Sequence, residues 1–323
     1  MIHVKMIRSL VLASLLLGGC STVPDKPEPV SKEQEAGKLF DGTLNADILG
    51  VAEIKSAEAA ELQGEQALSA GDVDRAAALL VRSLQLEPTR ISASLTLARL
   101  YRRQNNSAFA VRAYQYTLGQ QSENVEALEG LGMTALEQRQ YPLSQSLLEK
   151  SLKLWRESLE SGKTASGSLS PYIPVDAMVS LGVLLDMQKQ FDQAEISYKE
   201  ALQHRPRDPE ILNNLGYSRY LAGKWDEAGQ WYQQALAYDV NNPRTVRNLA
   251  LLRVRQENYQ EAVYLLEQIV SPWEARNDAG YLAMLAGDYD QAGQLLHEAT
   301  EAAPFYYEQA FANLSRLRQL RTR

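Results

Sequence analysis

Cysteine and histidine are scarce in this chain of 323 residues, which has one cysteine and three histidines. A single cysteine cannot form an intramolecular disulfide. His3 lies near the start, and His204 and His297 lie far apart in separate predicted helices, so they cannot share a metal ion. The chain also lacks the G-x-S-x-G motif of serine hydrolases. We therefore expect no metal, cofactor, small-molecule substrate or catalytic site, and the sequence favours a binding protein over an enzyme.

Basic residues are outnumbered by acidic ones, 33 against 40, which gives a formal net charge of -7. This balance argues against nucleic acid as a partner. Long hydrophobic runs are missing as well. The apolar run Leu10–Leu17 is too short to cross a bilayer, because a spanning helix needs about 20 such residues. The composition therefore predicts a water-soluble body.

The only cysteine ends a three-part pattern at the start of the chain. Two basic residues come first, the apolar run Leu10–Leu17 follows, and residues 17–20 read LGGC. This pattern resembles the signal peptide and lipobox of bacterial lipoproteins. The resemblance implies removal of residues 1–19, acylation of Cys20 with palmitate-type chains and, because Ser21 follows, delivery to the outer membrane. We expect a lipid-anchored protein that faces the periplasm, with the lipid on Cys20 as its only non-protein group.

Residues 20–45 form the next predicted segment. They carry Pro24, Pro27 and Pro29 among charged and small residues, and they show no apolar periodicity. This composition predicts a tether between the lipidated cysteine and the folded body. Residues 46–56 are expected to form a short leading helix.

From about residue 57 the chain has helical periodicity and an internal repeat. Residues 209–242 show the unit best, because apolar and small residues follow helical spacing in two blocks separated by Gly223. Gly216 and Ala228 are small, so the two helices can approach closely. Equivalent pairs, twelve residues apart and mostly at a period of 34, occur seven times: Gly64 and Ala76, Ala98 and Ala110, Gly132 and Ser144, Gly182 and Ala194, Gly216 and Ala228, Ala250 and Ala262, Gly280 and Ala292. One hairpin cannot bury its apolar face, so the units are expected to stack.

This pattern resembles the tetratricopeptide repeat (TPR), which has Leu-Gly in its first helix, Gly-x-Tyr-x-x-Ala across the turn, and an aromatic residue, Ala and Pro in its second helix. The match is close in residues 215–235 and 287–304. The resemblance implies an all-α TPR solenoid, a right-handed superhelix of about seven helix-turn-helix repeats with a C-terminal capping helix. Repeats one to three fall in residues 46–156 together with the leading helix, and repeats four to seven fall in residues 175–306.

Two further segments complete the predicted organisation. Residues 157–174 contain serines, glycines and prolines, which predicts a loop after an extended second helix of repeat three. In residues 307–323, apolar residues at helical spacing alternate with arginine and glutamine, which predicts a capping helix and a basic tail. A cationic cluster, Arg99, Arg102 and Arg103, lies in the first helix of repeat two. These arginines either pair with glutamates of the neighbouring repeat or contact an acidic partner or lipid headgroups.

The first helices of TPR proteins line a concave groove, so the resemblance implies a peptide-binding groove here. The candidate groove residues in repeats five to seven are Asn213, Asn214, Tyr217, Tyr220, Arg244, Arg247, Asn248, Leu251, Asn277, Tyr281 and Met284. Asparagine amides can hydrogen-bond an extended peptide backbone, and tyrosines supply contact area. Alternatively, the asparagines bond neighbouring helices and the tyrosines pack between repeats. The lysine-asparagine clamp that some TPR proteins use for a terminal carboxylate is missing, because Asn213 and Tyr217 occupy its positions.

The lipobox combined with the repeat motifs N-N-L-G-Y, R-N-L-A-L and N-D-A-G-Y resembles the TadD-like lipoproteins of Flp/Tad (type IVb) pilus assembly loci. The resemblance implies a protein-protein interaction scaffold in pilus assembly or Tad secretion, with a pilotin-like action on a secretin. The expected partners are cell-envelope proteins, a secretin or other pilus and secretion subunits among them, and the membrane through the lipid. The alternative is a TPR lipoprotein scaffold for peptidoglycan hydrolases or other cell-envelope machinery.

Overall fold

The structure is a computed structural model that describes residue 39, residues 50–161 and residues 172–322. The signal peptide predicted at residues 1–19, the lipidated Cys20 and almost all of the tether at residues 20–45 lie outside the described residues. Within the described ranges, the secondary structure consists of fifteen α-helices, with no strand. None of these helices has both the length and the apolar content needed to cross a bilayer.

The helices alternate between a first and a second helix of each repeat. The first helices are α2 (Ala57–Ser69), α4 (Ile91–Arg103), α6 (Val125–Glu137), α8 (Val175–Met187), α10 (Pro209–Leu221), α12 (Pro243–Arg255) and α14 (Pro272–Ala286). The second helices are α3 (Val73–Leu86), α5 (Ser107–Gln120), α7 (Tyr141–Ser161), α9 (Phe191–His204), α11 (Trp225–Tyr238), α13 (Tyr259–Leu266) and α15 (Tyr289–Ala302). The last helix, α16 (Glu308–Arg321), packs on α15 and α14 as the predicted cap. The seven predicted repeats are therefore present.

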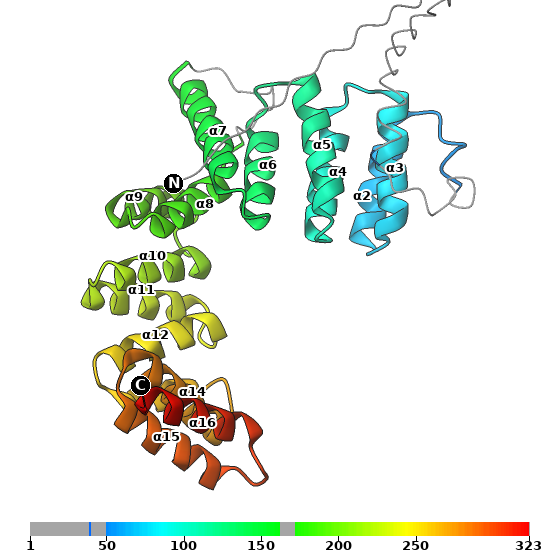
Figure 1. The fold of residues 1–323 in the computed structure, drawn as a ribbon. Helices are drawn as coiled ribbons and strands as arrows, with labels where there is room; N and C mark the ends of the chain where they lie inside the picture. Colours follow the sequence, from blue (N-terminus) through cyan, green and yellow to red (C-terminus); the bar gives the residue numbers. More distant parts are fainter. Residues whose placement is uncertain (1–38, 40–49, 162–171, 323) are drawn as a thin grey trace, which may run out of the picture.

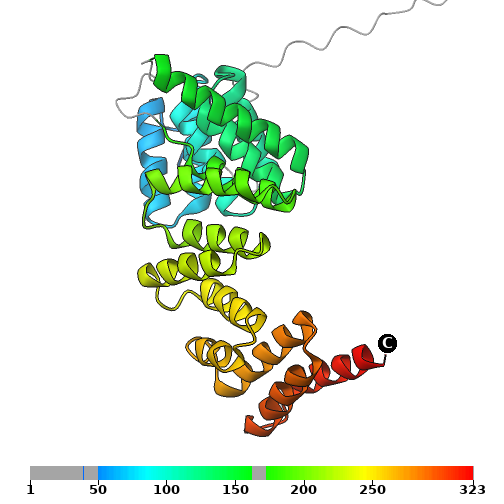
Figure 2. The same cartoon turned by 90° about the vertical axis from the view of Figure 1, so that its left-hand side faces the viewer.

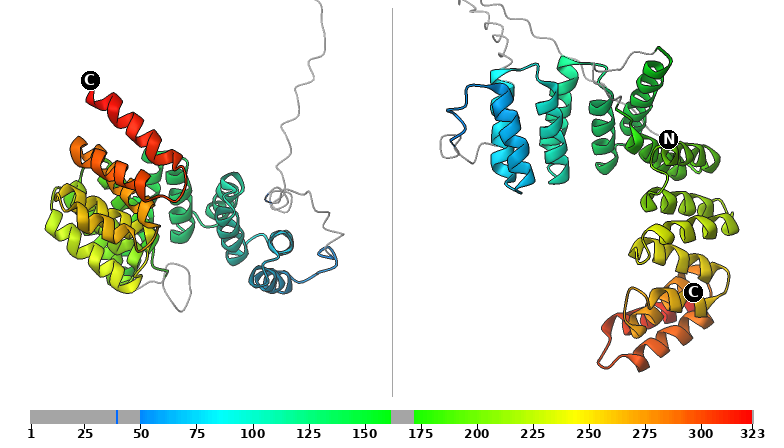
Figure 3. Two further views of the ribbon diagram at one scale, coloured as in Figure 1. Left: turned by 90° about the horizontal axis from the view of Figure 1, so that it is seen from below. Right: turned by 180° about the vertical axis from the view of Figure 1, so that it is seen from behind.

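The repeats stack into an elongated, bent array (Figure 1). Helices α2 to α7 form one row, and α8 to α16 continue in a second row that leaves the first at a steep angle. Views from the side and from behind show the same chain order along the array, with α2 and α16 at opposite ends (Figures 2 and 3). Each repeat contacts mainly its neighbours, as expected for a solenoid.

Local sequence signals fix where many of the helices begin. The side chains of Asp72, Asn124 and Asp208 accept hydrogen bonds from backbone N–H groups in the first turns of α3, α6 and α10. Such caps satisfy donors that have no partner inside the helix. Proline stands in the first turn of α10, α12 and α14, where its missing N–H costs nothing.

Close approach of the paired helices depends on the small residues of the repeat. A Cβ atom on Gly216 would lie 2.7 Å from the ring of Tyr232 and 3.3 Å from the carbonyl oxygen of Ala228. Gly182 has the same relation to Tyr198, again at 2.7 Å. Any side chain at these glycines would have to push the second helix away. The predicted close packing of Gly216 against the second helix is therefore confirmed.

Three boundaries differ from those expected from the sequence. Residues 50–56 form turns and extended backbone rather than part of a leading helix, and the first helix begins at Ala57. Helix α7 continues to Ser161, so the first five residues of the predicted loop at 157–174 are helical. Residues 162–171 of that loop lie outside the described residues. Finally, α13 has only eight residues, compared with fourteen in α11 and α15, which accounts for the shortened spacing between repeats six and seven.

Candidate functional site: the concave surface

The first helices form one continuous side of the array. From α4 to α16, each first helix contacts the first helix of the next repeat as well as its own second helix. The side on which successive helices lie closest is the inner side of a curved stack, so the first helices line its concave surface. Side chains on α10, α12 and α14 that remain exposed there are the candidates for binding.

The structure places the predicted groove residues at three depths. Tyr217, Arg244 and Arg247 are exposed, with Tyr217 39% exposed. The half-buried residues are Asn214, Tyr220, Asn248, Leu251 and Tyr281. The buried residues are Asn213, Asn277 and Met284. Only the exposed and half-buried residues can contact a ligand without rearrangement of the fold.

Three of the predicted asparagines take part in hydrogen bonds between neighbouring helices. Asn248 donates from Nδ2 to Oδ1 of Asn213 at 2.9 Å, which joins α12 to α10. Asn313 on α16 donates in the same way to Asn277 on α14, also at 2.9 Å. Both acceptors are buried, so the expectation that Asn213 and Asn277 face a peptide is wrong. The expectation that Met284 faces the groove is wrong for a similar reason, because its side chain packs in the apolar core of repeats six and seven.

An aromatic strip lies along the concave surface and consists of the exposed Tyr217 and the half-buried Tyr220 and Tyr281. The rings of Tyr217 and Tyr220, both on α10, are stacked with centroids 6.0 Å apart and an interplanar angle of 20°. The guanidinium of Arg316 on α16 lies 5.9 Å from the ring centroid of Tyr281 on α14. Arg255 donates from Nε to the hydroxyl of Tyr220 at 3.1 Å. Aromatic rings and guanidinium groups thus share the same surface over α10 to α16.

Positive charge is in excess on this part of the surface. Helix α12 contains four arginines and no acidic residue. Arg244 pairs with Glu210 at 3.1 Å and Arg253 pairs with Glu261 at 2.7 Å. Arg247 and Arg255 form no ion pair among the residues that the structure describes. Burial raises the pKa of Asp278 on α14, and the charge of nearby Arg247 acts against this increase. The guanidinium of Arg255 is therefore available to an acidic ligand, and that of Arg247 is available beside Asp278, in a protein that is acidic overall.

The cationic cluster of repeat two is mostly neutralised within the fold. Arg99 pairs with Glu126 at 2.8 Å, and Arg102 pairs with Glu137 at 3.3 Å. Both glutamates belong to α6, the first helix of the next repeat. Of the two alternatives considered from the sequence, pairing with the neighbouring repeat is the one that the structure shows for these two arginines.

The sequence analysis did not single out two polar residues, the buried Arg219 and the half-buried Asp186. Arg219 on α10 is fully buried and donates from Nη1 to Glu195 at 2.6 Å and from Nη2 to the carbonyl oxygen of Phe191. Asp186 on α8 accepts hydrogen bonds from Ser218 at 2.6 Å and from Tyr198 at 2.9 Å, and burial raises its pKa. These groups join repeat four to repeat five. The only sequence signal for such contacts is that the carboxylate of Asp186 and the arginine Arg219 stand about one repeat apart.

Residues 95–160 and 179–244 match the family described as tetratricopeptide repeat. Together with the paired helices and the contacts between first helices, this match identifies the fold as an all-α TPR solenoid. Proteins of this class use extended concave surfaces to bind other proteins.

Several solved structures have a similar fold. A tetratricopeptide repeat protein from Parabacteroides merdae is 14% identical with a TM-score of 0.54, and the match covers 82% of this chain and 99% of that chain. PilW, described as a widely conserved type IV pilus biogenesis factor, is 15% identical with a TM-score of 0.51 over 80% and 98%. PilF from Pseudomonas aeruginosa is 17% identical with a TM-score of 0.50 over 86% and 100%. No curated protein sequence matches this chain. At sequence identities this low, the comparisons show that the fold is shared and nothing beyond it.

Proposed function

We propose that the protein is a non-enzymatic scaffold that binds an acidic segment of another protein on the concave surface of repeats five to seven. The observation that carries this proposal is the aromatic strip together with Arg247 and Arg255, whose guanidinium groups form no ion pair in the described part of the chain. Tyrosine rings provide apolar contact area with little loss of side-chain entropy. Arginines that form no ion pair within the fold provide charge-assisted hydrogen bonds to carboxylates.

Tyr217→Ala combined with Arg247→Ala tests this surface. We expect the double variant to recover partner proteins from solubilised membranes at least about tenfold less efficiently, because both an aromatic and a charged contact are removed. Asn248 is left intact, since it bonds buried Asn213 and its loss would disturb the fold.

The matched control is Tyr238→Ala combined with Arg207→Ala. It removes an exposed tyrosine and an exposed arginine outside the concave surface. The control is expected to behave as the unmodified protein, and circular dichroism should show the same helicity for all three proteins. Equal recovery by the two double variants would exclude the concave surface as the binding site.

We propose further that the scaffold is held on the periplasmic face of the outer membrane by a lipid on Cys20. The support is the sequence pattern that ends at Cys20 and the serine that follows it. Cys20→Ala is expected to release the protein from membranes, because the acyl chains would have no attachment site. Membrane fractionation measures this, and a variant that remains in the outer-membrane fraction would contradict lipid anchoring.

Within the cell envelope, we propose a role in Flp/Tad pilus assembly or secretion, with a pilotin-like action on a secretin. The repeat motifs resemble those of TadD-like lipoproteins, and PilW, which shares the fold, is described as a type IV pilus biogenesis factor. Anchoring the concave surface at the membrane would raise the effective concentration of a captured subunit. Deletion of the protein is expected to lower the amount of secretin multimer in the outer membrane, and an unchanged amount would argue against the pilotin-like role.

A further inference from the structure

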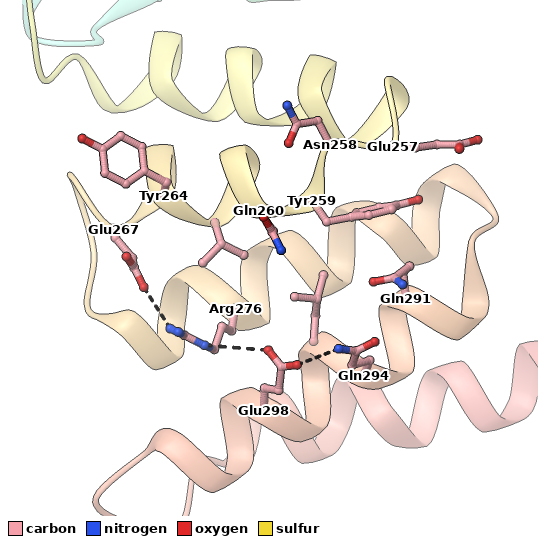
Figure 4. A pocket seen from close by; sticks show the side chains of 12 residues that line it. Glu257, Asn258, Tyr259, Gln260, Tyr264, Glu267, Arg276, Gln291, Gln294 and Glu298 are labelled. Atoms are coloured by element: carbon pink, nitrogen blue, oxygen red, sulfur yellow. Dashed lines mark hydrogen bonds and ion pairs between the residues drawn. The ribbon is translucent and has the colours of Figure 1, made fainter.

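A second recess lies on the outer side of the array, where α13 and α15 face each other (Figure 4). These are the second helices of repeats six and seven, so the recess, here called the outer cleft, is separate from the concave surface. Its volume is about 620 Å³. The outer cleft lies beside α13, the shortest second helix in the described part of the chain. Helix α13 has eight residues, whereas every other second helix has at least fourteen.

One face of each helix lines the outer cleft. Val263 from α13 and Leu295 from α15 are the aliphatic residues of the lining, and Gln260, Gln291 and Gln294 add amide side chains to it. Leu295 is already buried and Val263 is half-buried. Two helices with an apolar strip between them and polar groups along the edges form the kind of groove that accepts a third, amphipathic helix.

Carboxylates dominate the charge of the outer cleft. Glu257, Glu267 and Glu298 line it, whereas Arg276 is its single cation. Arg276 lies 2.9 Å from Glu267 and 3.9 Å from Glu298, so one guanidinium is shared between two carboxylates (Figure 4). Glu257 has no ion-pair partner within the described ranges. The lining therefore has a net charge of about -2, which favours a cationic occupant.

We infer that the outer cleft binds a helical segment of a partner protein in which apolar side chains are flanked by lysine or arginine. The apolar side chains would lie along Val263 and Leu295. The cations would reach the carboxylates of Glu257, which has no ion-pair partner in the described ranges, and of Glu298, which accepts a hydrogen bond from Gln294 at 2.9 Å and lies 3.9 Å from Arg276. This preference is opposite to that of the concave surface, where the unpaired groups are arginines. The two surfaces therefore select different segments, and this inference does not depend on the proposed function.

A designed peptide tests the inference on the full protein. The probe is a fluorescein-labelled 14-residue peptide with leucine at helical spacing and lysine at the other positions, and its matched partner carries glutamate in place of lysine. We expect the lysine peptide to bind at least about tenfold more tightly than the glutamate peptide in fluorescence anisotropy titrations. Photo-crosslinking followed by mass spectrometry should place the lysine peptide on α13 and α15.

Glu257→Gln combined with Glu298→Gln removes two carboxylates while keeping side-chain size. This variant is expected to weaken binding of the lysine peptide at least about tenfold. The control, Glu65→Gln with Glu227→Gln, removes two exposed carboxylates on α2 and α11, away from the cleft, and should change binding less than about twofold. Equal weakening by both variants, crosslinks outside α13 and α15, or equal binding of the glutamate peptide would overturn the inference. Tyr217→Ala with Arg247→Ala should leave lysine-peptide binding unchanged, which separates this test from that of the concave surface.

Discussion

Glu129 on α6 is a carboxyl group that the fold buries between repeats three and four. It accepts a hydrogen bond from the backbone N–H of Ala177 at 2.7 Å and another from the hydroxyl of Tyr172. Ala177 lies in the first turn of α8, whose own N-cap residue, Pro174, has no capping side chain. Burial raises the pKa of Glu129 to about 7, against the effect of both hydrogen bonds. Glu129 of repeat three therefore caps the first helix of repeat four. The protonation of its side chain changes near neutral pH.

Stability is expected to fall with rising pH because of Glu129. A carboxyl group with a raised pKa retains its proton in the folded state after the unfolded chain has released it. Its contribution is full below pH 4.5, the pKa of the unfolded group, and is lost as pH rises through about 7. The shift corresponds to about 3 kcal/mol. Glu129→Gln should therefore lose less stability than the unmodified protein between about pH 5 and about pH 8 in urea unfolding.

Glu123→Gln serves as the control for this pH effect. Glu123 is exposed and lies near α6, so its replacement should leave the pH dependence as it is in the unmodified protein. Glutamine at position 129 can still accept the bond from the Ala177 N–H, so the variant should fold. If Glu129→Gln and the unmodified protein lose the same stability over this interval, the proton of Glu129 is not coupled to folding.

The burial of individual side chains was predicted less well than the helices in which they lie. The period of 34 correctly placed Asn213 and Asn277 in first helices, but it could not show that α12 and α16 bury them. Burial of these amides depends on the distance between repeats, which is set by the packing of Tyr232 and Leu296 against glycines of the first helices. Tyr217 shares the same phase and remains exposed. Sequence period therefore defines a face of a helix, whereas depth on that face depends on the neighbouring repeat.

The turn between the two helices of each repeat is built on one left-handed residue. Positive φ angles occur at the same position in all seven repeats: Gly71, Asn105, Arg139, Lys189, Gly223, Glu257 and Gly287. Glycine adopts this conformation freely, whereas a residue with a Cβ atom is strained by about 1–2 kcal/mol. Four repeats therefore carry backbone strain that the stacked helices impose.

Replacing a strained residue with glycine should stabilise the array. Lys189 has a φ angle of 60° and no ion pair in the described part of the chain. We expect Lys189→Gly to raise the free energy of unfolding by about 0.5–1 kcal/mol, since part of the gain is offset by the greater flexibility of glycine in the unfolded chain. Lys189→Ala removes the same side chain but keeps the strain, so it should give no such gain. Thermal unfolding of the two variants measures the difference, and an equal effect would contradict the strain argument.

Helices and turns could largely be predicted from the sequence, because each repeat carries its own caps, small residues and turn glycine. The break at Gly223 was recognised for this reason, and its φ angle of 74° confirms it. The leading helix predicted at residues 46–56 was wrong over residues 50–56, where the segment adds Val51 to the core of the first repeats without forming a helix. The shortening of α13 could be noticed from the spacing but not located, since no proline or glycine ends that helix.

At the scale of the whole molecule, the apolar core is divided among successive parts of the array. One cluster covers α2 to α5 and reaches α6, a second covers α6 to α10, and a third covers α12 to α16. The junction between repeats five and six is filled by a small cluster of four buried residues: Ala228, Tyr232, Leu249 and Leu252. Polar contacts such as Asn248 to Asn213 supplement it. The repeat period predicted a continuous stack, but the unequal division of the core depends on the contacts of these particular residues.

The small cluster between repeats five and six makes this junction the place where the array should separate on partial unfolding. In a solenoid, stability is approximately a sum of repeat and interface contributions, so a weakened interface allows the repeats beyond it to open locally. Leu249→Ala removes apolar volume from this junction and should cost about 2–5 kcal/mol there. Hydrogen-exchange mass spectrometry is expected to show faster exchange throughout α12 to α16, with α2 to α9 unchanged. Leu84→Ala, in the cluster of the first repeats, should give the reverse pattern. Uniform acceleration along the chain in both variants would mean that the array unfolds as one cooperative unit.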